Sequence, residues 1–198
     1  MKIDSDQLIP LNKPSEVRQE SPDDVQDVKT LRFFSRTGTH LLLPYHHAYQ
    51  GYDCQQFPIS LLIGEAAVFD VSAAAGHGSV TRECIKGSED QLREQDMVIL
   101  FSGGSDPGAD VDLTFELFQW LLSRRPKLIG VDAPELTVSG KADLLYAICS
   151  CNNIPVALNL TNLQPISGTR PTIFALPIPL QGAEACMCGV IAVTDRPR

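Results

Sequence analysis

Short apolar runs alternate with polar turns from residue 30 to the C-terminus, and most of these runs predict strands. Runs of this kind that end in glycine or an acidic residue are typical of buried strands. The predicted strands are 31–36, 60–72 (one strand or two), 96–102, 127–133, 154–160, 171–180 and 186–194. The chain is therefore expected to be rich in β-structure.

Two segments instead place apolar residues at helical spacing. In the first segment, 110–125, the apolar positions are Leu113, Leu117, Trp120 and Leu121. Either Asp110 or Asp112 could cap the start of this helix. A second helix is expected from Lys141 to about Cys151. Many strands combined with two to three helices predict an α/β or α+β fold.

The composition fits one domain with an N-terminal arm. The chain has 198 residues, 43% of them apolar, which is enough for a substantial core. Residues 1–29 are polar and acidic, so we expect them to form an arm and residues 30–198 to form the domain. A formal net charge of −8 disfavours nucleic acid and anionic membrane surfaces as partners.

Membrane insertion and secretion are also disfavoured. No apolar run approaches the roughly 18 residues that span a bilayer. The N-terminus M-K-I-D-S-D lacks the hydrophobic core of a signal peptide. A cytoplasmic location is therefore predicted.

The cysteines predict free thiols. The chain has six, including the C-x-C pairs 149/151 and 186/188, but it has no C-x-x-C. Zinc sites usually have longer spacers and a second matching half. Both pairs lie in apolar runs, where alternate residues of a strand would face the same side. We therefore expect free buried thiols that pack as small apolar side chains.

Histidines gather in one segment. Three of the four, His40, His46 and His47, lie within residues 36–51, with a proline between the first two. A strand that turns at this proline could bring them to one site. The alternative is that they are surface or structural histidines that only form hydrogen bonds.

Two other kinds of site are disfavoured. The loop 102–110 joins a predicted strand to a predicted helix, but it lacks both the G-K-[ST] ending of a P-loop and the G-x-G-x-x-G spacing of a dinucleotide site. We therefore expect a connecting loop there. No G-x-S-x-G nucleophile elbow occurs, which disfavours serine hydrolase chemistry.

The segment R-T-G-T-H-L-L-L-P-Y-H, residues 36–46, resembles the signature H-x-G-T-H-x-D-x-P-x-H of the cyclase family, which includes bacterial kynurenine formamidase and isatin hydrolase. Further segments resemble the family in the same order: V-F-D-V-S, G-H-G-S-V-T, Q-D-M-V-I-L-F-S-G, K-L-I-G-V-D-A-P-E-L, I-P-V-A-L-N-L-T-N-L and A-L-P-I-P-L-Q-G-A-E-A. The resemblance implies a single α/β domain of the swivelling β/β/α type, with a mixed sheet and two to three helices.

The family's metal ligands are mostly replaced. Family members bind a divalent metal ion through two His and the Asp of the signature and through a later His and Glu. The corresponding positions here are Arg36, His40, Leu42, Tyr146 and Leu158. A metal ion needs three or more donors, and an arginine repels a cation. The resemblance thus implies that the metal site is lost, and no cofactor is expected.

The side chains at these positions suggest acid–base chemistry instead. His46 keeps the signature's final His, which transfers protons in the family, and imidazole suits this task near neutral pH. His40 and Tyr146 are the other candidate catalytic residues. Arg36 could hold a substrate carboxylate or an enolate oxygen, with His47 as a further substrate-binding residue. Such a site would be locally basic, and the net negative charge would lie elsewhere.

We therefore predict a metal-independent enzyme acting on a small oxygenated or carboxylate-bearing molecule. Dehydration or another elimination, lactonisation and cyclisation need only proton transfer, as in small-molecule biosynthesis, whereas amide hydrolysis is harder without a metal-activated water. Two alternatives stay open: a non-catalytic protein that binds a ligand or partner, and a metal-dependent amidohydrolase with a site rebuilt from His40, His46 and His47. The resemblance also implies a homodimer or a homotetramer.

Overall fold

A computed structural model describes residues 8–12, 34–47, 51–75, 77–103 and 109–194. Its strands are β1 (Leu8–Pro10), β2 (His40–Leu42), β3 (Ile63–Asp70), β4 (Met97–Phe101), β5 (Val111–Leu113), β6 (Ile129–Val131), β7 (Leu136–Val138), β8 (Val156–Leu158), β9 (Thr172–Pro177) and β10 (Ala185–Val193). Its α-helices are α1 (Phe115–Ser123) and α2 (Ala142–Cys151).

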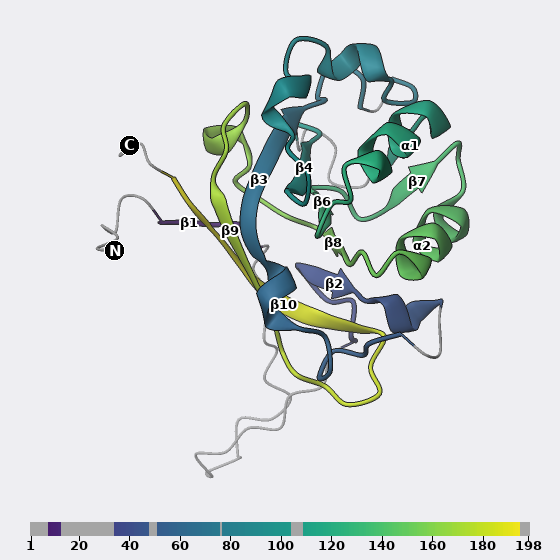
Figure 1. Cartoon of the computed structure of the whole chain (residues 1–198), viewed down its shortest axis with the longest axis vertical. Coiled ribbons are helices and arrows are strands. Elements are labelled where there is room, and N and C mark those ends of the chain that lie inside the picture. The colour runs from purple at the N-terminus through teal and green to yellow at the C-terminus, as the bar shows by residue number, and fades with distance from the viewer. Residues whose placement is uncertain (1–7, 13–33, 48–50, 76, 104–108, 195–198) are drawn as a thin grey trace, which may run out of the picture.

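The main sheet closes on itself like a barrel. Its strands follow the order β10-β2-β8-β6-β4-β3-β9, and β9 pairs again with β10 (Figure 1). The pairs β3–β4, β4–β6 and β6–β8 are parallel, whereas the pairs that involve β2, β9 or β10 are antiparallel. Parallel neighbours need crossover connections: those of β4–β6 and β6–β8 contain α1 and α2, and that of β3–β4 contains the 3₁₀-helices Arg82–Ile85 and Glu89–Gln91. The mixed sheet of an α/β domain is thus confirmed.

Alternate residues of the strands enter two separate apolar cores. In β3, Ala66 and Val68 face the interior of the barrel, whereas Ala67 and Phe69 face the helices. In β2, Leu41 points inward and Leu42 points to the helix side. Because successive strand side chains alternate between faces, His40 lies on the same side as Leu42, toward the helices.

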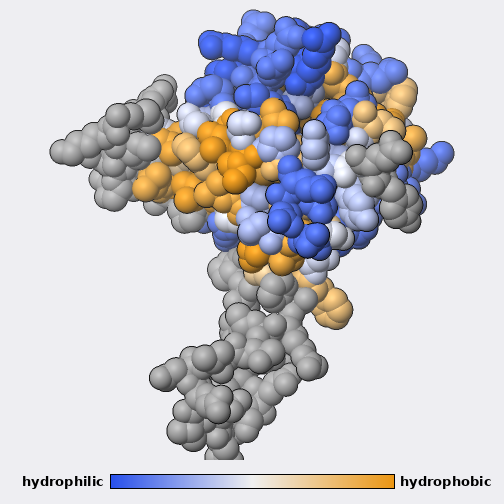
Figure 2. Space-filling view, turned by 60° about the horizontal axis from the view of Figure 1, so that its bottom comes forward, coloured by the Kyte–Doolittle hydropathy of each residue, from blue (hydrophilic) through white to orange (hydrophobic). Residues whose placement is uncertain are grey.

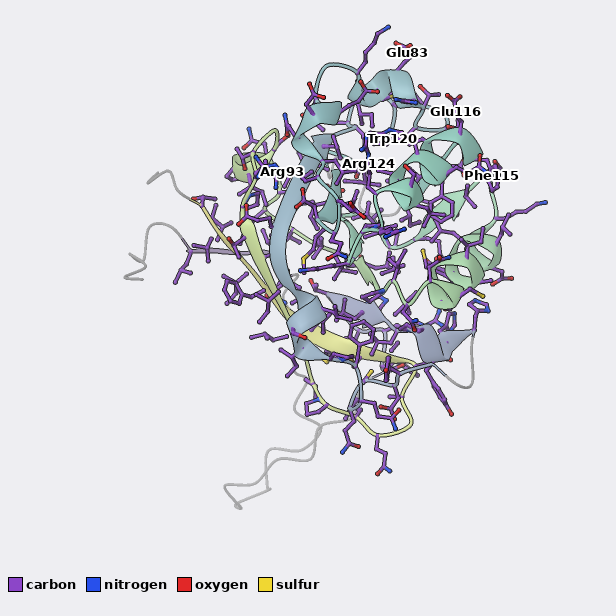
Figure 3. All side chains as sticks on the ribbon, in the orientation of Figure 1. Glu83, Arg93, Phe115, Glu116, Trp120 and Arg124 are labelled. Atoms are coloured by element: carbon purple, nitrogen blue, oxygen red, sulfur yellow. The ribbon has the colours of Figure 1, made fainter. Side chains whose placement is uncertain are left out.

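Helix α1 is amphipathic. It buries Leu117, Phe118 and Leu121 against the sheet. Its other side carries Phe115, Glu116, Trp120 and Arg124, labelled in Figure 3. The guanidinium groups of Arg82 and Arg124 lie 5.2 and 5.4 Å from the centre of the Trp120 ring.

Most predicted elements are confirmed. Strands occur within the predicted ranges 60–72, 96–102, 127–133, 154–160 and 171–180, and β10 covers nearly all of 186–194. Helix α2 matches the predicted second helix within one residue. In the predicted strand 31–36, the described residues 34–36 form no strand and lead into a turn, because Thr37 N–H donates to the Phe34 carbonyl.

The predicted start of the first helix is wrong. Residues 111–113 form β5, which pairs in parallel with β7, and the helix begins only after Thr114. Thr114 accepts a hydrogen bond from Leu117 N–H and is the actual N-cap. The Asp112 carboxylate instead accepts hydrogen bonds from Ser79, Thr137 and Gly140.

The N-terminal segment contributes to the core, which its polar composition did not predict. β1 pairs antiparallel with β10, and the side chains of Ile9 and Leu11 are buried in the barrel interior. Residues 1–7 and 13–29 of the expected arm lie outside the described residues, as do residues 104–108 of the loop 102–110.

The six cysteines are all free. Cys186 and Cys188 are buried on β10, as expected for a strand. The other pair lies on α2, where Cys149 is buried as predicted, whereas Cys151 is exposed, so the prediction of burial was wrong for Cys151. Burial raises the pKa of Cys149 and of Cys188 to about 12, so both thiols stay protonated at neutral pH. In the described part of the chain, no helix is long and apolar enough to cross a membrane.

Candidate functional site

The candidate site residues meet where the outer face of β2 approaches α2 (Figure 1). Strand β2 supplies His40, and the 3₁₀-helix that follows it, Pro44–His46, supplies His46. Helix α2 contributes Tyr146. The residue before β10, Glu184, joins them because its carbonyl accepts a hydrogen bond from Leu43 N–H.

A glycine turn fixes His40. Gly38 has a φ of 61°, which favours glycine, and its carbonyl accepts a hydrogen bond of 2.9 Å from His40 Nδ1. The Nδ1 atom of the neutral ring therefore carries the proton, and Nε2 has the lone pair. Burial lowers the pKa of His40, and the positive charge of Arg36 lowers it further, so the ring is neutral at pH 7.

His46 forms a pair with a carboxylate. Its Nδ1 lies 3.1 Å from Glu184 Oε2, and the Nη2 atom of Arg36 lies 3.1 Å from Glu184 Oε1. Because a carboxylate only accepts, this contact places the proton of neutral His46 on Nδ1 and leaves Nε2 as the basic atom. Arg36 Nη2 is also 3.3 Å from each ring nitrogen of His46.

The exposed fractions show which member of this group is sheltered. The side chains of Arg36 and Glu184 are 44% and 45% exposed, whereas that of His46 is 15% exposed. Partial burial alone would raise the pKa of Glu184, but the contacts with His46 and Arg36 outweigh it and hold this pKa below its usual range. Glu184 is therefore ionised at neutral pH and can orient His46.

The other two predicted residues surround His46. The ring centres of His46 and His47 are 4.4 Å apart, and those of His46 and Tyr146 are 5.9 Å apart, with edge-to-face geometry in both cases. His47 is exposed, and burial together with the charge of His46 lowers its pKa. The five residues predicted from the sequence thus lie around one site, although their roles stay predictions.

Tyr146 has a partner that the sequence analysis did not assign. Its hydroxyl donates a hydrogen bond to Glu135 Oε1 and accepts one of 3.5 Å from Leu136 N–H. Burial raises the pKa of Tyr146, and so do the hydrogen bond and the charge of Glu135. Tyr146 was expected to act on a substrate as a catalytic residue, but its hydroxyl proton is donated to the Glu135 carboxylate.

The expectation of a locally basic site is wrong. Among the described residues, Glu135 and Glu184 bring two carboxylates to the site, and Arg36 brings one permanent positive charge. Both acids lie in segments that resemble the family, A-P-E-L and Q-G-A-E-A, at the end or the start of a predicted strand. Their position next to predicted strands is the sequence signal that could have found these two acids. Only the order of the strands in the sheet brings the two carboxylates to one site.

The comparisons with known proteins agree on one family. The family model described as "Putative cyclase" matches residues 3–137, more than half of the chain. The chain belongs to the cyclase family. Among curated relatives, the kynurenine formamidase of Salinibacter ruber is 29% identical over 175 residues, which cover 85% of this chain and 80% of the relative. The kynurenine formamidase of Erythrobacter litoralis is 23% identical over 170 residues, covering 83% and 76%.

Solved structures of cyclase-family proteins have the same fold. Isatin hydrolase A from Labrenzia aggregata, bound to benzyl benzoate, is similar with a TM-score of 0.77 at 16% identity, covering 96% of this chain and 94% of that one. Isatin hydrolase A from Ralstonia solanacearum has a TM-score of 0.75 at 16% identity, covering 95% and 92%. A protein described as a novel cyclase has a TM-score of 0.72 at 12% identity, covering 97% and 90%.

The side chains at the family's metal positions do not fit a metal ion. Leu42 and Leu158 have no donor atoms, and both are buried in the apolar core beneath the helices. Arg36 is a cation that already pairs with Glu184. Within the described ranges, no three His, Cys, Asp or Glu side chains are grouped to hold a metal ion. Tyr146 keeps an oxygen, but its hydroxyl donates its proton to Glu135, and the remaining imidazole of His40 is too little for a stable site.

Proposed function

We propose that the protein is a hydrolase that acts on a carbonyl group of a small oxygenated molecule by acid–base catalysis, without the family's metal ion. The observation that carries this proposal is the 3.1 Å contact between Glu184 and His46 Nδ1, which directs the basic Nε2 atom away from the carboxylate. The names of the curated relatives support hydrolysis over the elimination and ring closure predicted from the sequence.

In this reaction, Nε2 of His46 takes a proton from water as the water oxygen bonds to the carbonyl carbon. The N–H groups of Arg36 stabilise the negative charge that develops on the carbonyl oxygen. The bond from the carbonyl carbon to the leaving oxygen or nitrogen then breaks, and His46 returns the proton to the leaving group. The products are a carboxylic acid and an alcohol or amine. Elimination and ring closure would use the same groups.

The test measures kcat/KM on phenyl acetate, isatin and N-formylkynurenine after exhaustive treatment with EDTA and phenanthroline. We expect the treated wild type to keep its activity on at least one of these compounds. His46→Ala should lower that activity by about 10²- to 10⁴-fold, because general base catalysis contributes on this scale.

The matched control is His77→Ala, which removes an exposed histidine outside the site and should retain wild-type kcat/KM. Activity that disappeared on chelation and returned with Zn²⁺ or Mn²⁺ would contradict the proposal. Absence of turnover of all three compounds by the wild type would favour the non-catalytic alternative.

A further inference from the structure

The segment 52–54 contacts the element that carries His46. The Tyr52 carbonyl accepts a hydrogen bond of 3.4 Å from the N–H of Tyr45, which precedes His46 in the same 3₁₀-helix. The ring centres of Tyr52 and Phe57 are 6.1 Å apart, with edge-to-face geometry, and Phe57 is buried in the barrel interior. The segment is therefore fixed both to the turn that presents the imidazole and to the core.

The same segment also binds the two residues that precede Glu184. The Oδ2 atom of Asp53 accepts a hydrogen bond of 2.7 Å from the N–H of Gly182. The N–H of Cys54 donates to the carbonyl of Ala183 at 3.1 Å. Because the side chain of Glu184 is 45% exposed, little packing holds it, and its position depends on where its backbone is held.

The carboxylate of Asp53 serves two segments at once. Its Oδ1 atom accepts hydrogen bonds of 3.0 and 2.8 Å from the N–H groups of Gln55 and Gln56, while Oδ2 accepts the one from Gly182. Asp53 is 5% exposed, yet the hydrogen bond from Gly182, joined by those from Gln56 and Gln55, outweighs burial and holds its pKa below its usual range. One oxygen of the ionised carboxylate thus stabilises its own turn, and the other holds the segment before Glu184.

We propose that Asp53 is a positioning residue, which holds Gly182 and Ala183 so that the Glu184 carboxylate stays at His46 Nδ1. This inference deepens the proposed function and rests on it for the role of the His46–Glu184 pair. If Glu184 moved away, Nδ1 would lose its acceptor, and the proton of the neutral ring could occupy Nε2 instead. Nε2 is the atom that must take the proton from water, so the site would lose its base.

The test compares Asp53→Asn with the wild type. A carboxamide has one acceptor oxygen, so the variant keeps the turn with Gln55 and Gln56 and loses the hydrogen bond from Gly182. On a compound that the wild type hydrolyses, kcat should fall by about 10- to 100-fold, because a displaced catalytic group slows the reaction on this scale. KM should change by less than about twofold, since the base acts in the transition state.

A second measurement needs no turnover. The nitrogen chemical shifts of the His46 ring, assigned by their absence in His46→Ala, distinguish the Nδ1–H tautomer from the Nε2–H tautomer at a pH where the ring is neutral. We expect the Nδ1–H tautomer in the wild type and a shift toward Nε2–H in Asp53→Asn. A loss of folding stability alone would not move this signal in molecules that remain folded.

Asp112→Asn is the matched control. Asp112 lies on β5, outside the site, and its carboxylate also links separate segments, through hydrogen bonds from Ser79, Thr137 and Gly140. Its replacement should lower the free energy of unfolding, but the tautomer of His46 and kcat should stay as in the wild type.

Gly182→Ala disturbs the same contact from its other side. Gly182 has a φ of 72°, which strains an alanine, although an added Cβ would meet no described atom within 4 Å. The variant should therefore displace the N–H that binds Asp53 and change the tautomer of His46 and kcat in the same direction, to a smaller extent. If Asp53→Asn does not fold, Gly182→Ala decides by the same two signals.

Failure of this inference can be distinguished from failure of the proposed function. An unchanged His46 tautomer in Asp53→Asn, or a wild type without the Nδ1–H tautomer, would overturn the inference and leave the hydrolase proposal to its chelation test. In an active wild type, a changed tautomer with unchanged kcat would also overturn it. A wild type that hydrolyses nothing but shows the tautomer change contradicts only the hydrolase proposal.

Discussion

Burial distinguishes His40 from the other histidines of the site. His40 is 3% exposed and its Nδ1 is bound by the Gly38 carbonyl, whereas His47 lies at the surface. Its charged surroundings are Arg36, which disfavours protonation, and Glu135, which favours it. Burial is the largest effect, so the folded protein holds His40 neutral at a pH at which an unfolded chain would bind a proton.

This difference predicts a loss of stability on mild acidification. The pKa of His40 is lowered in the folded state, so the unfolded state takes up the proton first as the pH falls below about 6.5. The free energy of unfolding should therefore decrease from about pH 6.5 down to the folded pKa of His40, by at most about 1.4 kcal/mol per pH unit. Urea unfolding at a series of pH values measures this dependence.

His40→Gln should weaken the pH dependence of the free energy of unfolding, because it removes the imidazole that titrates. His47→Gln is the comparison variant: the pKa of His47 is lowered in the same direction, but its imidazole is exposed whereas that of His40 is buried, so His47→Gln should change the dependence less than His40→Gln does. The lowered pKa of Glu184 acts in a separate window, because stability from this carboxylate is lost only below its ordinary pKa near 4.3. An unchanged pH dependence in His40→Gln would contradict the role given to its burial.

At the scale of elements, α1 shows how tertiary pairing overrides a local capping signal. Asp112 precedes a helical pattern and is a good N-cap residue, but it lies in β5, which pairs with β7. Its carboxylate accepts hydrogen bonds from Ser79, Thr137 and Gly140 and so links three segments of the chain. The N-cap lies two residues later, at Thr114, whose hydroxyl accepts the hydrogen bond from Leu117 N–H.

Removal of the actual cap should weaken this helix. Thr114→Ala is expected to lower the free energy of unfolding by about 1 kcal/mol, because the N–H of Leu117 loses its partner. Asp110→Ala is the control, because Asp110 is exposed and was the other N-cap candidate predicted from the sequence. It should change the free energy of unfolding by no more than about 0.5 kcal/mol. Chemical denaturation compares the two variants, and an equal or larger loss in Asp110→Ala would contradict the assignment of the cap.

At the scale of the whole molecule, β10 closes the barrel by pairing with several strands. Residues Ala185–Met187 pair with β2, Cys188–Val193 pair with β9, and the last three residues of β10 also pair with β1. The helices leave this side uncovered, and Figure 2 shows apolar surface gathered there. Leu8, Leu176 and Ile178 are exposed there, at 42%, 45% and 42%.

The N-terminal strand is expected to be part of the folded unit. Leu11 is completely buried in the barrel interior, so Leu11→Ala should lower the free energy of unfolding by about 2–5 kcal/mol through lost burial and a residual cavity. Leu8→Ala, on the exposed face of the same segment, should cost much less. Thermal or urea unfolding of both variants tests this, and a neutral Leu11→Ala would show that residues 8–12 do not stabilise the domain.

The sequence alone determined the elements whose signal is local. The apolar runs that became β4, β6 and β8 and the periodicity that became α2 depend on side chains a few residues apart, and they were predicted close to their observed bounds. The signature at residues 36–46 likewise placed His40, His46 and Arg36 together, since they lie on one short segment.

Only the tertiary structure decided how distant segments meet. Glu184 reaches His46 because β10 pairs with β2, and Glu135 reaches Tyr146 because the segment after β6 packs against α2. The same long-range pairing turned residues 111–113 into a strand and gave Asp112 a role other than capping. These contacts join residues far apart in the chain and depend on strand order and register, which local patterns of polarity do not encode.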